Sequence, residues 1–161
     1  MADALVANAS PLIFLSRGGH WGLLHEFAQR ILVPEPVAEE IRLKGPADVT
    51  AKALEETSWI EVVPAPTVPE SILEWGLGRG ESTVLAVAAA NPGMEALIDD
   101  LAGRRCAACL GIPVRGTLGI VLTAKKRGLI PYARPVIEEL IRSGLYLSRP
   151  VIEEALKRVG E

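Results

Sequence analysis

The stretch Glu95-Ala-Leu-Ile-Asp-Asp-Leu-Ala-Gly-Arg-Arg105 holds a short apolar run that ends abruptly in two adjacent carboxylates. Residues 96–98 suit a buried strand, and the residues after Asp100 are typical of a helix. Open α/β sheets place their sites at this kind of position, where a parallel strand ends and a helix begins. Asp is also a preferred N-cap residue and suits the positive end of a helix dipole. Asp99 and Asp100 therefore have two interpretations, a functional site or simple helix capping.

Short apolar runs alternate with helical segments along the whole chain. The predicted strands are residues 4–7, 31–33, 59–63, 96–98 and 112–114. The predicted helices start at Ser10-Pro11, with Ser10 as the N-cap, near Trp21 and at Pro36, and cover residues 48–57, 81–90, 101–110 and 117–126. This alternation predicts an α/β fold with a parallel sheet covered by helices on both faces.

A six-residue sequence occurs twice towards the C-terminal end. Arg134-Pro-Val-Ile-Glu-Glu139 recurs as Arg149-Pro-Val-Ile-Glu-Glu154, and each copy predicts a helix with two glutamates in its first turn. Two copies are too few for a repeat architecture. A chain of 161 residues suits one domain, so we expect residues 1–161 to form a single domain in which 134–161 supply C-terminal helices.

The composition is that of an ordinary soluble globular protein. Aromatic residues make up only 4%, which argues against binding that depends on many stacked bases. No apolar run approaches the roughly 20 residues that span a bilayer, and no basic segment precedes the first apolar run as in a secretory signal. Cys106 and Cys109 lack the partners of a disulfide framework or a zinc site and suit ordinary burial. We therefore expect a cytoplasmic protein with no membrane partner.

Positive charge is concentrated in one part of the chain. Residues 101–137 contain seven basic residues and no acidic one, so all 20 acidic residues lie elsewhere. A basic region favours a polyanionic partner if its side chains share one face of the fold. The sequence leaves open whether they share a face or are scattered over several elements. The basic residues are Arg104, Arg105, Arg115, Lys125, Lys126, Arg127 and Arg134.

Several strand and helix ends carry side chains with acidic or amide oxygens. They belong to Asn8, Glu40, Glu81 and the pair Asp99–Asp100. Because the carboxyl ends of parallel strands meet at one edge of a sheet, we expect the strand-end residues to lie together there and the two glutamates to face them from helices. Carboxylates gathered in this way repel one another unless a cation neutralises them. The pattern therefore predicts a hard divalent ion, Mg²⁺ or Mn²⁺.

The order of these residues resembles that of the PIN-domain family over most of the chain. PIN domains open with a strand that ends in Asp, a small residue and Ser or Thr, where this chain has Asn8-Ala-Ser10. Glu40-Ile41 resembles the second acidic position, Glu81 in Gly-Glu-Ser-Thr-Val-Leu-Ala the third, and Asp100 the fourth, with Asp99 beside it. The wording Asn-Ala-Ser-Pro-Leu-Ile, Ile-Asp-Asp-x-x-x-Arg-Arg and Gly-Thr-Leu-Gly-Ile is similar to one prokaryotic branch of predicted PIN proteins.

The resemblance implies a three-layer α/β/α fold and metal-dependent hydrolysis of phosphodiesters in single-stranded or structured RNA. One or two ions of Mg²⁺ or Mn²⁺ would activate water for the attack. Many relatives are toxins of toxin–antitoxin pairs, and many are homodimers. The expected partners are therefore RNA, an antitoxin protein and a second copy of this chain.

The resemblance also implies roles for particular residues. Glu40, Glu81 and Asp100 would be the main metal ligands, Asn8 a weak ligand, and Ser10 an outer contact. Arg104, Arg105 and the run Lys125-Lys126-Arg127 would hold the RNA backbone by charge, without reading its sequence.

One residue departs from the family pattern, because Asn8 stands where the family has its first Asp. An amide oxygen coordinates a hard cation, but it is neutral and cannot act as a base. Asp99 could supply the lost charge, which would explain two adjacent acids where one suffices. A PIN-fold module that binds RNA or a protein without cutting is therefore an alternative function. A third is a small-molecule or phospho-acceptor α/β domain, although such receiver domains carry acids after their first strand.

Overall fold

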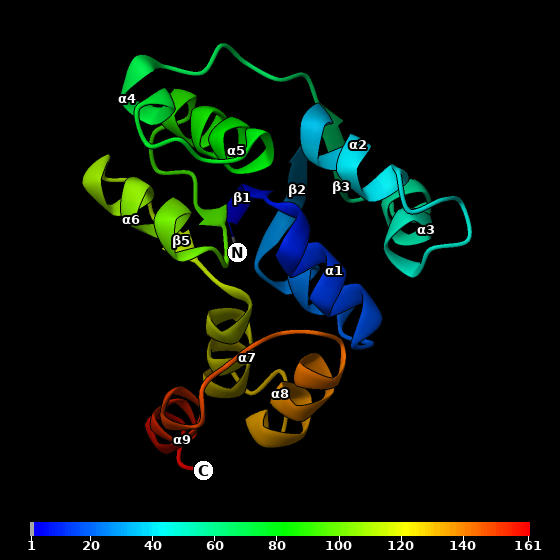
Figure 1. Ribbon diagram of the computed structural model, residues 1–161. Coiled ribbons are helices and arrows are strands. Elements are labelled where there is room, and N and C mark those ends of the chain that lie inside the picture. Colours follow the sequence, from blue (N-terminus) through cyan, green and yellow to red (C-terminus); the bar gives the residue numbers. More distant parts are fainter. Residues whose placement is uncertain (1) are drawn as a thin grey trace.

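The computed structural model describes residues 2–161, with a five-stranded, all-parallel sheet at its centre (Figure 1). The strands lie in the order β3-β2-β1-β4-β5. They are β1 (Ala2–Ala7), β2 (Ala28–Pro34), β3 (Ile60–Val63), β4 (Ala96–Leu97) and β5 (Val114–Arg115). The predicted α/β fold with a central parallel sheet is confirmed.

The helices of residues 2–161 cover both faces of this sheet. They are α1 (Ala9–Arg17), the 3₁₀ helix η1 (Trp21–Glu26), α2 (Glu35–Arg42), α3 (Val49–Glu56), α4 (Glu70–Leu73), α5 (Arg79–Ala90), α6 (Leu101–Cys109), α7 (Thr117–Lys126), α8 (Ala133–Arg142) and α9 (Arg149–Arg158). Strands β1, β2 and β3 follow one another towards one edge of the sheet, and β4 and β5 follow one another towards the opposite edge. Because crossovers between parallel strands are right-handed, α1–α3 lie on one face and α4–α6 on the other (Figure 1). Helices α7 and α8 then contact α1.

The core forms where the two faces of β1 meet these helices. Strand β1 pairs with β2 on one side, Val6 opposite Leu32, and with β4 on the other, Val6 opposite Ala96. Its last residues are fully buried, as a central strand of a parallel sheet requires. Helix α5 is buried over most of its length, from Ser82 to Ala88, which fits its nearly all-apolar sequence.

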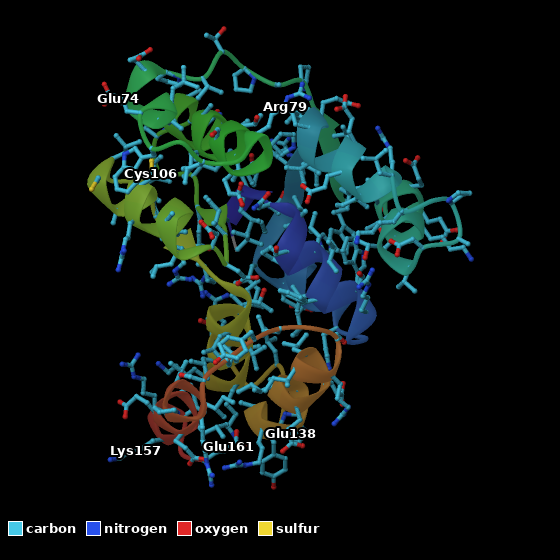
Figure 2. All side chains as sticks on the ribbon, in the orientation of Figure 1. Glu74, Arg79, Cys106, Glu138, Lys157 and Glu161 are labelled. Carbon is cyan, nitrogen blue, oxygen red and sulfur yellow. The ribbon has the colours of Figure 1, made fainter. Side chains whose placement is uncertain are left out.

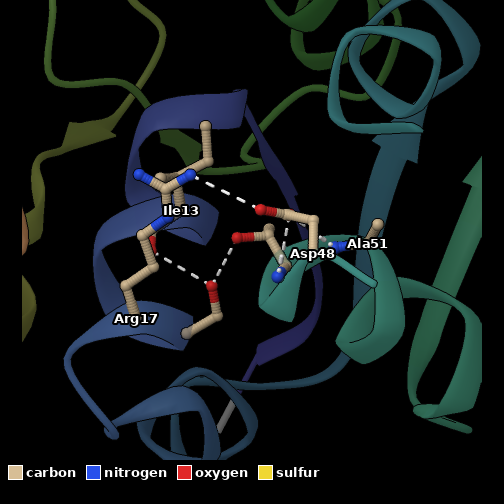
Figure 3. A network of polar contacts seen from close by, with 6 residues as sticks. Ile13, Arg17, Asp48 and Ala51 are labelled. Atoms are coloured by element: carbon tan, nitrogen blue, oxygen red, sulfur yellow. Dashed lines mark hydrogen bonds and ion pairs between the residues drawn. The ribbon is translucent and has the colours of Figure 1, made fainter. Parts of the chain in front are cut away.

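A small polar network joins α1 to α3 (Figure 3). The hydroxyl groups of Ser16 and Thr50 lie 2.7 Å apart in the interior, and Ser16 also donates to the carbonyl oxygen of Ile13. Asp48 caps α3 by accepting bonds from the backbone of Thr50 and Ala51. The helix predicted over residues 48–57 therefore forms as α3, and its N-cap is Asp48, one of the residue types preferred there.

Several local predictions were wrong in detail. Ser10 is not an N-cap, because α1 already begins at Ala9 and Asn8 holds the N-cap position without a side-chain bond. The predicted second helix is the 3₁₀ segment η1, and the short helix α4 was not foreseen. The paired glutamates 138–139 and 153–154 lie beyond the first turns of α8 and α9, since these helices begin before the prolines that marked their starts. The helix dipole therefore does not explain those glutamates.

Within residues 2–161, no helix combines the length and the apolar character that crossing a membrane requires.

Candidate metal and nucleic-acid site

The candidate site lies where the direction of strand order reverses. Strands β1 and β4 are neighbours, and the backbone N–H of Asn8 donates to the carbonyl oxygen of Leu97 at 3.0 Å. Asn8 therefore leaves β1 beside the point at which Asp99 and Asp100 leave β4. Reversal points of this kind are where open α/β sheets leave a crevice for ligands, outside the carboxyl ends of the strands.

A cavity of about 390 Å³ opens next to this crevice. Its walls come from the start of α1, the middle and end of α2, and the start of α5. Among the sequence-predicted site residues it contains Asn8, Ser10, Glu40 and Glu81. The structure thus brings together residues that are up to 73 positions apart in the chain, as the sheet-edge argument predicts.

Gly80, in the first turn of α5, lies close to two of the predicted site residues. A Cβ atom at Gly80 would lie 3.0 Å from Oδ1 of Asn8 and 3.5 Å from Oε2 of Glu40. A Cβ atom there would require the Asn8 oxygen to shift by a few tenths of an ångström, whereas its distance to Glu40 would be an ordinary contact. Asn8 is itself 5% exposed, so its amide is held inside the protein rather than free in solvent.

Gly103, on α6, lies near two more of the predicted acids. A Cβ atom there would lie 3.7 Å from Cγ of Glu81 and 3.8 Å from Oδ2 of Asp100. Asp100 accepts a bond from the backbone N–H of Gly103 at 3.0 Å and is the N-cap of α6. The carboxylate of Glu81 reaches back towards Gly78, the N-cap position of α5. The capping interpretation of Asp100 therefore holds, and it does not remove Asp100 from the neighbourhood of Glu81.

Asp99 points to a different neighbour. Its two carboxylate oxygens accept bonds from the backbone N–H and the hydroxyl of Thr117, each at 2.7 Å. Thr117 is fully buried at the start of α7, so Asp99 ties the end of β4 to that helix. Neither Asp99 nor Asp100 lines the cavity that contains Asn8 and Glu40, but Asp100 lies near Glu81 beside Gly103, whereas Asp99 is bonded to α7.

The donor chemistry of the site fits a hard divalent cation. Asn8, Glu40, Glu81 and Asp100 offer only oxygen atoms, which are the ligands that Mg²⁺ and Mn²⁺ prefer. In the arrangement described for residues 2–161, no three His, Cys, Asp or Glu side chains are gathered tightly enough to enclose an ion. Asp100 accepts a bond from the backbone of its own helix and Glu81 lies against Gly78, so enclosing an ion would require side-chain rearrangement.

The basic residues of 101–137 do not form one open face. Lys125 donates to the carbonyl oxygen of Pro131, lies 3.6 Å from the carboxylate of Glu161 and stacks over Tyr132. The guanidinium group of Arg127 lies over the ring of Phe27. These cations already stabilise the packing of the helices that follow β5.

The remaining cations of this region differ in exposure. The half-buried Arg104 lies against Gly116, close to Asp99. Arg105 and Lys126 are exposed and free to meet a ligand in solution. The basic residues of 101–137 thus serve partly in packing contacts and partly as exposed surface groups.

Two charged residues of the cavity were missed by sequence reasoning. Glu39 and Arg79 line it beside Glu40 and Glu81, and they form an ion pair with each other at 3.5 Å. Glu39 directly precedes Glu40 in the sequence, and Arg79 lies two residues before Glu81. That proximity was the available signal, because residues one or two positions apart on a helix can both reach the same cavity.

The cysteines and histidines lie outside the site. Cys106 is buried as expected, and burial together with the neighbouring Cys109 raises the pKa of its thiol, which makes it unreactive. Cys109 is exposed, contrary to the expectation of burial. His20 is partly buried and contacts Glu139, and the exposed His25 stacks on Trp59.

Comparison with known proteins agrees with the geometry. A search of curated proteins found no relative that matches this chain. A family model described as a PIN domain matches residues 4–161, which is nearly the whole sequence. The chain therefore belongs to the PIN-domain family.

Proposed function

We propose that this protein is a metal-dependent ribonuclease that hydrolyses phosphodiester bonds. The PIN domain is a fold typical of nucleases, and PIN domains typically bind Mg²⁺. The observation that carries the proposal is that Asn8 and Glu40 both lie near Gly80 in the first turn of α5, and that Glu81 and Asp100 both lie near Gly103 in the first turn of α6. These residues lie near the reversal point of the sheet, where ligands of such folds bind.

The residues divide the work in the following way. Glu40, Glu81 and Asp100 would hold Mg²⁺ or Mn²⁺ by their carboxylates, Asn8 would contribute a neutral oxygen, and Ser10 would support the site from the cavity wall. The bound ion supplies activated water and neutralises charge on the phosphate. Asp99 stands apart from this set, because it is bonded to Thr117 of α7 and does not line the cavity. Arg104, Arg105, Lys125, Lys126 and Arg127 remain the proposed contacts to the RNA backbone, with the exposed Arg105 and Lys126 the most accessible.

A second function is favoured by one observation, the neutral and buried Asn8. An uncharged Asn8 makes the cavity attract a divalent ion less strongly. The second candidate function is therefore a PIN-fold module that binds RNA or a protein without cutting it.

We also propose a toxin role with an antitoxin partner, a homodimeric state and a cytoplasmic location. Size-exclusion chromatography with light scattering tests the dimer, and expression with and without a co-expressed neighbouring gene tests toxicity and its neutralisation.

The decisive experiment is cleavage of a labelled mixed-sequence RNA in Mg²⁺ or Mn²⁺, with EDTA as the metal-free reference. Wild type, Asp100→Asn and Asn8→Asp are compared, and Asp3→Asn serves as a control at the opposite, exposed end of β1. Metal-dependent cleavage that Asp100→Asn abolishes and Asp3→Asn preserves supports the nuclease. A silent wild type with an active Asn8→Asp variant supports a disabled site. If both are silent, the binding module is the better description.

A further inference from the structure

Arg79 is the basic residue among the described residues that line the cavity at the sheet edge. It is the first residue of α5 and lies between the ends of α5 and α2, where Figure 2 labels it. The rest of the charged lining is acidic, from Glu39, Glu40 and Glu81. A phosphate that entered this cavity would therefore meet three carboxylates and one guanidinium group.

The position of Arg79 is not explained by the stability of its helix. A cation in the first turn of a helix faces the positive end of the helix dipole, which is unfavourable. Its one ion pair, with Glu39, is 3.5 Å long, and the two side chains are 74% and 52% exposed. Pairs as exposed as this contribute little to folding, because water screens the charges and the side chains lose freedom. Arg79 therefore contributes little to the fold where it stands.

The exposure of Arg79 and its weak ion pair are suited to binding a ligand. The weak pair with Glu39 keeps the guanidinium at the rim of the cavity, and a stronger partner displaces it at little cost. A phosphate is such a partner, since a guanidinium group binds two of its oxygens at once through parallel N–H bonds. The other proposed RNA contacts lie on α6 and α7 and do not line this cavity.

We propose that Arg79 binds a phosphate of the nucleic acid directly at the cavity, and that Glu39 holds Arg79 in place when no nucleic acid is bound. The inference rests on the proposed nucleic-acid function of the site and names the residue that contacts the substrate there. Arg79 and the neutral Asn8, which stands where the family has Asp, both make the site less negative and so favour a phosphate. Arg79 would bind RNA whether or not a metal ion is present.

The test is the affinity of wild type and Arg79→Ala for a fluorescent single-stranded RNA, measured by anisotropy in EDTA over a range of salt concentrations. Arg158→Ala is the matched control, because Arg158 also forms one exposed ion pair of 3.5 Å, with Glu154 on the distant helix α9. Arg79→Lys keeps the charge but loses the paired N–H bonds. Cleavage in Mn²⁺ is measured on the same proteins, and their thermal unfolding confirms that they are folded.

We expect Arg79→Ala to weaken RNA binding about tenfold and to reduce the slope of log K against log salt by about 0.7, the value for one phosphate contact on a single strand. Arg79→Lys should recover part of the affinity, and Arg158→Ala should bind as wild type does. Equal affinity and equal salt slope for Arg79→Ala and wild type would overturn the proposal. So would a wild type that does not bind RNA.

These outcomes separate the inference from the proposed nuclease activity. A wild type that binds RNA through Arg79 but does not cut contradicts the nuclease and keeps the inference. A wild type that cuts, with Arg79→Ala unchanged in KM and affinity, keeps the nuclease and overturns the inference.

The role of Glu39 is tested by a double-mutant cycle. If Glu39 restrains Arg79, Glu39→Gln should strengthen RNA binding more in wild type than in Arg79→Ala. An equal gain in both backgrounds would show that Glu39 acts only as a repelling charge, and would remove that half of the proposal.

Discussion

At the scale of single residues, Asn8 sets the charge of the candidate site. Its amide oxygen lies beside Glu40 across Gly80, in a buried position at the end of the central strand. A carboxylate in its place would repel Glu40 when no ion is bound and attract a divalent ion strongly. The choice of an amide therefore favours a stable metal-free protein over tight metal binding.

We expect Asn8→Asp to lower the thermal stability of the protein in EDTA and to increase its stabilisation by Mg²⁺. Unit charges about 4 Å apart interact by roughly 4 kcal/mol at an effective dielectric constant of about 20, so Mg²⁺ affinity should rise on the order of tenfold or more. Unfolding temperatures at increasing Mg²⁺ measure this. Asn91→Asp is the control, because Asn91 lies at the other end of α5. Identical Mg²⁺ responses in the two variants would contradict the proposed ligand role of Asn8.

The adjacent carboxylates Asp99 and Asp100 should respond differently to mutation. Asp99→Ala leaves the buried N–H and hydroxyl of Thr117 without partners, which should cost about 1–3 kcal/mol of unfolding free energy. Asp100→Asn keeps an N-cap for α6, so it should remain stable but lose Mg²⁺ affinity. Urea unfolding and Mg²⁺ titration measure the two effects. Loss of Mg²⁺ affinity in a stably folded Asp99→Asn would show instead that Asp99 is a ligand.

At the scale of elements, the Asp48 cap fixes the start of α3 and its contact with α1 (Figure 3). Burial by itself raises the pKa of Asp48, but hydrogen bonds from the backbone of Ala51 and the nearby Arg17 outweigh it and lower the pKa. A carboxyl group whose pKa is lower in the folded state stabilises the protein above its unfolded pKa. That stabilisation is lost as the pH falls through the folded pKa.

We expect Asp48→Ala to lose about 1–2 kcal/mol of unfolding free energy at neutral pH, as removal of a helix cap does. Asp48→Asn keeps a capping oxygen and isolates the charge. The stability difference between wild type and Asp48→Asn should be constant above about pH 5 and should shrink below pH 4, where the unfolded carboxyl group gains its proton. Urea denaturation across this pH range is the measurement. A difference that does not change with pH would show that the charge of Asp48 plays no part.

At the scale of the whole molecule, Glu161 ties the last helix to the rest of the fold. Its carboxylate accepts bonds from the backbone N–H groups of Ala133 and Arg134 at the start of α8, and Lys125 of α7 lies 3.6 Å away. Burial raises the pKa of Glu161, but these backbone bonds and Lys125 outweigh it and lower the pKa. One side chain thus connects the ends of three helices.

We expect Glu161→Gln to weaken the docking of α9 and to cost about 1 kcal/mol of unfolding free energy at neutral pH, with the effect shrinking as the pH falls below the pKa of the unfolded carboxyl group and through its lowered folded pKa. Amide hydrogen exchange should become faster at the start of α8 and along α9. Glu153→Gln, an exposed position on the same helix, is the control and should leave both measurements unchanged. Unaltered exchange in Glu161→Gln would mean that apolar packing alone holds α9.

The alternation of short apolar runs with helical segments was enough to predict the parallel sheet, because each strand and helix carries its own periodicity. The same holds for the helix over residues 48–57 and for the acids at strand ends, which depend on residues close together in sequence. The order of Asn8, Glu40, Glu81 and Asp100 was likewise sufficient to identify the family.

Only the tertiary structure decided which side-chain oxygens lie near one another and which basic side chains are left out of packing contacts. Gly80 and Gly103 are ordinary residues in the sequence, yet Gly80 brings α5 close to the Asn8 oxygen and Gly103 brings α6 close to Ile98. Asp99 and Asp100 are neighbours whose side chains turn to different helices, because successive residues leaving a strand point in different directions. Lys125 is taken up in a helix junction, whereas Arg79 is left at the cavity rim. Such pairings depend on distances between segments far apart in the chain, which no local pattern records.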